Sequence, residues 1–99
     1  MTAPLRSESA APGLRVVLIE DSAMLRGMLR EMLEELDGVA VVAEAEDEQG
    51  ALAALETQCP DLAIVDLELR AGSGLGVLRQ LQAEPARFGR PRAVVFSNY

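Results

Sequence analysis

The feature that most constrains the fold of this chain is a regular alternation between short apolar runs and longer segments with helical spacing. The apolar runs have the length and β-branched content of strands in a parallel sheet that is covered on both faces. They occupy residues 14–20, 39–45, 61–67 and 93–96. Helical patterns lie between them, at residues 23–36, 48–58 and 75–83. The order βαβαβαβ predicts an α/β fold, a doubly wound parallel sheet with right-handed crossovers.

Local signals set the expected ends of the helices. Ser22 and Asp47 are good N-caps for the first and second helices, Gly38 favours the turn that ends the first, and Pro60 stops the second. Loops are expected over residues 70–74 and 84–92. The first helix carries an apolar stripe at three-to-four spacing, made of Leu25, Met28, Leu29, Met32, Leu33 and Leu36.

Composition narrows the function. The 99 residues suffice for one small domain, and all nine basic residues are Arg, so the chain has neither Lys nor His. A Schiff-base lysine, a P-loop and a phosphohistidine are therefore excluded. The net charge of −7 argues against a nucleic-acid surface and suits a site that holds a cation.

The expected location is cytoplasmic. Cys59 is the only cysteine, which excludes an intrachain disulfide and fits a reducing compartment. Residues 1–13 lack the apolar run of a signal peptide and are predicted to be a flexible tail. No stretch approaches the length of a membrane span, so no membrane contact is expected.

Polar residues follow three of the predicted strands. Glu20 and Asp21 end the first, Asp66 ends the third and Ser97 ends the fourth. Any one of them alone is most often a helix cap or a loop residue. The carboxyl ends of parallel strands share one edge of a sheet, however, and ligands bind there in doubly wound folds. Three carboxylates brought together repel one another, and a hard cation such as Mg²⁺ relieves that repulsion.

Three segments carry a family resemblance: VVLIEDSAMLRGML, PDLAIVDLELRAGSGLGVLRQL and AVVFSN. In their order and spacing they resemble the diagnostic stretches of bacterial two-component response-regulator receiver domains, and the resemblance covers residues 14–99. It implies a flavodoxin-like fold and a role in phosphorelay signalling. The partner would be a sensor histidine kinase or a phosphotransfer protein. The domain would be no enzyme beyond its own phosphorylation and dephosphorylation.

The resemblance also implies roles for individual residues. Asp66 would be the phosphoacceptor, and Asp21 and Asp66 would bind Mg²⁺ directly, with Glu20 acting through water. The backbone carbonyl of Glu68 would be a further metal ligand. Ser97 would hydrogen-bond a phosphoryl oxygen. Glu68 and Tyr99 would tune the lifetime of the phosphoryl group, and residues 72–74 would form the turn before the third helix.

The chain departs from the family pattern after the fourth strand. Receiver domains have five strands and five helices, so helix four, strand five, helix five and a lysine that pairs with the acceptor are missing here. The strand at 93–96 is then expected to be an exposed edge beside an apolar patch. Three interpretations are open: a fragment of a longer protein, a deliberate truncation, or two copies that pair through the fourth strand or swap segments.

Two other functions stay open. One is a pseudo-receiver that acts by protein contacts without phosphotransfer, favoured by the missing lysine. The other is a hydrolase of the aspartyl-phosphatase type, for which Glu68 stands where a second Asp is expected. Arg26 and Arg30 of the first helix are either part of a kinase-docking face or solvated charges.

Overall fold

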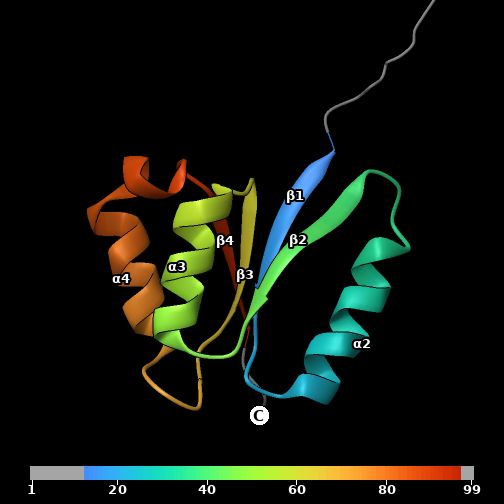
Figure 1. Cartoon of the computed structure of the whole chain (residues 1–99), viewed down its shortest axis with the longest axis horizontal. Helices are drawn as coiled ribbons and strands as arrows, with labels where there is room; N and C mark the ends of the chain where they lie inside the picture. Colours follow the sequence, from blue (N-terminus) through green and yellow to red (C-terminus); the bar gives the residue numbers. More distant parts are fainter. Residues whose placement is uncertain (1–12, 97–99) are drawn as a thin grey trace, which may run out of the picture.

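The computed structural model describes residues 13–96, which form one four-stranded parallel sheet with helices on both faces (Figure 1). The elements follow in the order β1 (Leu14–Ile19), α2 (Ala23–Glu34), β2 (Val39–Ala45), α3 (Glu48–Gln58), β3 (Leu62–Asp66), α4 (Gly74–Ala83), the short 3₁₀ helix η1 (Pro85–Phe88) and β4 (Arg92–Phe96). The alternation predicted from the sequence is confirmed, with ends that differ by one or two residues. The tail before Gly13, and Ser97 and Tyr99, lie outside the described residues.

The strand order is β2-β1-β3-β4, so β1 and β3 are neighbours as the strand-end argument required. Val16 to Ile19 pair with Leu62 to Val65, and Asp66 pairs with Phe96 of β4. The pairing of β1 with β2 shifts register between Val16 and Val17. Within the described chain, β4 is an edge strand, and Val94 and Val95 are about half exposed.

The predicted caps are present: the side chains of Ser22 and Asp47 each accept a hydrogen bond from a backbone N–H in the first turn of α2 and α3. Ser73, which was not predicted as a cap, does the same for α4. Gly38 has the positive φ of +80° that the turn after α2 requires. The 3₁₀ helix η1 interrupts what was predicted to be a plain loop, and it buries Phe88 completely.

The two faces of the sheet are covered unequally. Figure 1 shows α3 and α4 together on one face and α2 alone on the other. The main core lies under α3, α4 and η1. Its fully or almost fully buried members are Val17, Ile19, Ala45, Ala51, Leu55, Ala63, Val65, Val77, Leu81 and Phe88. In α2, by contrast, no residue is buried.

On the α2 face, an open hollow of about 350 Å³ is lined by Leu29, Met32 and Leu33 of α2 and by Ile64 of β3. The apolar patch expected over the third and fourth strands is thus seen at β3, and on β4 the large exposed apolar residues are Val94 and Val95. Among residues 13–96, no helix combines the length and apolar character needed to cross a membrane.

Candidate functional site

Three carboxylates meet at one edge of the sheet. Glu20 and Asp21 follow β1 directly, and Asp66 is the last residue of β3. One carboxylate oxygen from each lies within 4.8 Å of the others. Glu20 and Asp66 are fully buried, whereas Asp21 is partly exposed. The strand order explains the convergence, since β1 and β3 are adjacent and parallel and therefore end on the same edge.

Backbone donors hold two of the three side chains. An oxygen of Glu20 accepts from the N–H of Ser22 at 2.9 Å, and Oδ1 of Asp66 accepts from the N–H of Glu68 at 3.1 Å. Each bond spans two residues and turns the carboxylate back over the loop that follows its strand. These short-range bonds restrict the rotamers of both side chains, so the cluster is built largely before any ligand binds.

Crowding changes the acid–base behaviour of the cluster. The pKa of Glu20 is raised to about 7, first by burial and further by the neighbouring carboxyls of Asp21 and Asp66, although the bond from Ser22 offsets part of the effect. Burial and like charge both favour the neutral form of a carboxyl group. A cation bound at a site of this kind would offset both the burial and the like charge.

The loop after Asp66 packs closely against the start of α4. Glu68 pairs with Ser73 in an isolated bridge, and the N–H of Gly74 donates to the carbonyl of Leu67 at 3.0 Å. A Cβ atom on Gly74 would lie 2.2 Å from the carbonyl oxygen of Asp66, so this position has no room for a side chain. The turn at 72–74, noted from the sequence, thus fixes how near α4 comes to Asp66.

Glu48 fastens the same loop from the side of α3. Its carboxylate accepts from the N–H of Ser73 at 2.9 Å, and its own N–H donates to the carbonyl of Ala71 at 3.1 Å. Cβ atoms on Gly72 or Gly76 would lie 2.4 Å from this side chain, so two glycines make room for it. Sequence reasoning missed this residue, because its partner lies 25 positions away and no local pattern signals the contact.

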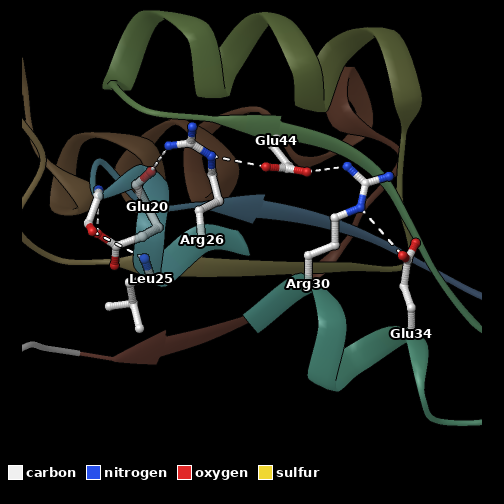
Figure 2. Close-up of polar contacts among 7 residues, drawn as sticks. Glu20, Leu25, Arg26, Arg30, Glu34 and Glu44 are labelled. Carbon is white, nitrogen blue, oxygen red and sulfur yellow. Dashed lines mark hydrogen bonds and ion pairs between the residues drawn. The ribbon is translucent and has the colours of Figure 1, made fainter. Parts of the chain in front are cut away.

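The partners of the two arginines of α2 were also not predictable from the sequence. Arg26 and Arg30 both form ion pairs with Glu44 of β2, and Arg30 is also paired with Glu34 (Figure 2). Arg26 further donates to the backbone carbonyl of Glu20 at 2.6 Å. Both guanidinium groups are ion-paired; the side chain of Arg26 is only 18% exposed, whereas that of Arg30 is 47% exposed.

The site residues predicted from the sequence therefore divide into two sets. Glu20, Asp21 and Asp66 are brought together, and the backbone of Glu68 is joined to Asp66 by a hydrogen bond. The side chain of Glu68 is exposed. Ser97 lies beyond the described residues, so its predicted contact with a phosphoryl group stays a prediction.

The family model described as "Response regulator receiver domain" matches residues 16–98. A curated relative from Myxococcus xanthus, "Protein-glutamate methylesterase/protein-glutamine glutaminase 5", is 39% identical over 86% of this chain. "Transcriptional regulatory protein PdtaR" of Mycobacterium tuberculosis is 36% identical over 85% of the chain. The chain spans 24% of the first relative and 40% of the second.

Solved structures agree on the fold. A two-component response regulator of the LuxR family from Aurantimonas is 30% identical and superposes with a TM-score of 0.78, covering 88% of this chain and 60% of that one. The response regulator domain of Thermotoga maritima CheB is 24% identical, with a TM-score of 0.77 over 86% of this chain and 60% of its own. The second likeness bears on the fold alone.

Proposed function

The chain belongs to the response regulator receiver domain family, and on that premise we propose that Asp66 accepts a phosphoryl group in a Mg²⁺-dependent reaction. Receiver domains act in two-component signalling. The observation that carries the assignment to Asp66 is its position: a buried carboxylate at the end of a central strand, with two further carboxylates within 4.8 Å.

The donor set fits Mg²⁺. Glu20, Asp21 and Asp66 offer oxygen ligands only, which hard cations prefer, and no nitrogen or sulfur ligand accompanies them in the cluster. The raised pKa of Glu20 supports the same assignment, because burial and the neighbouring carboxyls both disfavour its charged form and a bound cation would offset both effects. When bound, Mg²⁺ offsets the charge that gathers on the phosphoryl oxygens during transfer.

In the proposed step, a carboxylate oxygen of Asp66 attacks phosphorus. The new O–P bond forms as the bond from phosphorus to the donor's leaving atom breaks, and that electron pair stays with the leaving group. The product is an acyl phosphate on Asp66. The N–H of Glu68 keeps Oδ1 oriented, and the burial of Asp66 leaves it little freedom to rotate. Positioning of this kind supplies much of the rate in phosphoryl transfer.

The natural donor is proposed to be a phosphohistidine on a sensor kinase or a phosphotransfer protein. Residues 1–99 contain no His, so the phosphorylated imidazole would have to lie outside them. The partly exposed Asp21 marks the side from which the donor reaches the buried Asp66.

The test is covalent labelling by acetyl phosphate, followed by intact-protein mass spectrometry. The wild-type chain is expected to gain one phosphoryl group with Mg²⁺ and none with EDTA. Asp66→Asn should abolish the gain. Asp37→Asn is the matched control, because Asp37 is an exposed residue in the turn between α2 and β2. Labelling of Asp66→Asn at the wild-type level would refute the assignment.

The same assay separates the alternative functions. A chain that binds Mn²⁺ but gains no phosphoryl group would be a pseudo-receiver that acts through protein contacts. Steady release of phosphate from para-nitrophenyl phosphate, lost in Asp66→Asn, would instead indicate a hydrolase.

A further inference from the structure

We propose that Arg26 is a positioning residue for the carboxylate cluster: it fixes the backbone that carries Glu20 and Asp21 and thereby sets the affinity of the cluster for a divalent cation. The inference rests on the proposed Mg²⁺ site and deepens it, since it assigns a role to a residue that touches no metal ligand atom.

The first step is the backbone at the end of β1. The N–H of Glu20 donates to the carbonyl of Ala45 at 3.0 Å, which continues the pairing with β2. The carbonyl of Glu20 lies beyond the paired part of β1, and Nη1 of Arg26 donates to this carbonyl at 2.6 Å. Both backbone groups of Glu20 are therefore held from the β2 side of the sheet, just before the chain turns into Asp21.

The second step is what holds Arg26. Its Nε donates to Glu44 at 3.0 Å, and Glu44 is opposite Leu18 in the register of β1 and β2. One guanidinium thus joins the end of β1 to a side chain fixed on β2, as Figure 2 shows. The planar fork of Arg presents several donors in a fixed geometry, and a lysine ammonium on a flexible stem cannot reproduce this.

The third step is charge. Arg26, Glu44, Arg30 and Glu34 form an alternating chain of two positive and two negative groups (Figure 2). The field of Arg26 at the cluster is balanced by Glu44. Removing Arg26 leaves a net negative charge, which by itself strengthens cation binding. Loss of the backbone anchor weakens it. The two effects have opposite signs, so the measured direction distinguishes positioning from electrostatics.

Arg30 provides a matched control on the same helix. It too pairs with Glu44, and its replacement removes the same charge, but its hydrogen bonds go to Glu34 and Glu44 rather than to the backbone of Glu20. Arg26→Met and Arg30→Met therefore differ in the contact to the carbonyl of Glu20.

The experiment measures Mn²⁺ binding to the whole chain by electron paramagnetic resonance of the free ion, with Mg²⁺ as competitor. Arg26→Met should bind Mn²⁺ about tenfold more weakly than the wild type, the scale typical for residues that orient metal ligands. Arg30→Met should stay within about twofold. Arg26→Lys keeps the charge but not the planar guanidinium fork, and its affinity should be intermediate.

A second readout separates positioning from loss of fold. In labelling by acetyl phosphate, Arg26→Met should need more Mg²⁺ for half-maximal rate but reach the wild-type rate at saturation. A merely destabilised variant would lose maximal rate in proportion to its unfolded fraction, which circular dichroism measures. If Arg26→Met does not fold, Arg26→Lys carries the test.

Three results would overturn the proposal: unchanged affinity in Arg26→Met, tighter binding in Arg26→Met, or equal weakening in Arg26→Met and Arg30→Met. Absence of Mn²⁺ binding in the wild-type chain would instead refute the metal site, and with it the proposed function.

Discussion

The two faces of the sheet differ in how they are closed. Under α3 and α4, Leu55, Val77 and Phe88 are fully buried in a continuous core. Under α2, the helix buries no residue, and Met28 and Met32 are more than half exposed. Apolar packing therefore closes the face under α3 and α4 completely, whereas α2 packs less completely and is also joined to β2 by ion pairs to Glu44.

The largest expected effect comes from the same truncation made on each face. Leu55→Ala removes a fully buried side chain on α3 and should cost about 3–5 kcal/mol of unfolding free energy. Leu29→Ala removes a partly exposed one on α2 and should cost roughly 1 kcal/mol. Urea unfolding monitored by circular dichroism measures both. Equal losses would mean that the two faces are equally well packed.

A second pair of variants exchanges Gly for Ala. In Gly74→Ala the new methyl group meets the backbone of Asp66 and Leu67, which cannot move aside easily, so the variant should lose about 1–3 kcal/mol. It should also label poorly with acetyl phosphate. Gly27→Ala in α2 meets nothing within 4 Å and should gain up to about 1 kcal/mol from helix propensity. Thermal unfolding of both variants checks whether each substitution lowers or raises stability. A stable, fully active Gly74→Ala would contradict the close approach of Gly74 to the backbone of Asp66.

The smallest effect concerns pH. Because the pKa of Glu20 is raised from 4.5 to about 7 in the fold, the native state binds more protons than the unfolded chain between those values. The contribution of Glu20 is therefore fully present below pH 4.5 and is lost as pH rises through 7. After a discount for the solvent-facing edge of the site, the loss is roughly 1–2 kcal/mol.

Urea unfolding in EDTA at pH 4.5 and pH 8 measures this loss, with Glu20→Gln as the reference that cannot titrate. Between pH 4.5 and pH 8, the wild type should lose unfolding free energy relative to Glu20→Gln. Cation affinity should rise over the same range, since the cation displaces the proton. A pH-independent difference would show that the pKa of Glu20 is the same in the folded and unfolded chain.

The sequence predicted those parts of the fold that depend on local or topological rules. Caps at Ser22 and Asp47 act within three residues, and the convergence of Asp21 with Asp66 follows from adjacent parallel strands. Contacts between side chains far apart in sequence could not be predicted. Arg26 reaches Glu44 over 18 positions, and which face of α2 turns toward β2 depends on the packed structure.

The same limit explains two further features that were missed. The 3₁₀ helix at Pro85 to Phe88 carries no periodic pattern in four residues, yet it supplies the largest buried side chain of the core. The register shift beside Val17 leaves no mark in a run of apolar residues, because either register buries the same residue types.

The strand order has a consequence for folding kinetics. The unit formed by β1, α2 and β2 closes over short distances along the chain. In contrast, β3 must dock against β1 over a longer distance, and in the fold the N–H of Arg15 donates to Asp61, which lies 46 residues further along the chain. Closing long loops is slow, since the chain entropy is lost before the contacts form. Asp66 is carried by that late strand. Cation capture during refolding would therefore report the docking of β3 against β1, and a partly folded chain that lacked β3 at this edge would be unable to hold the ion.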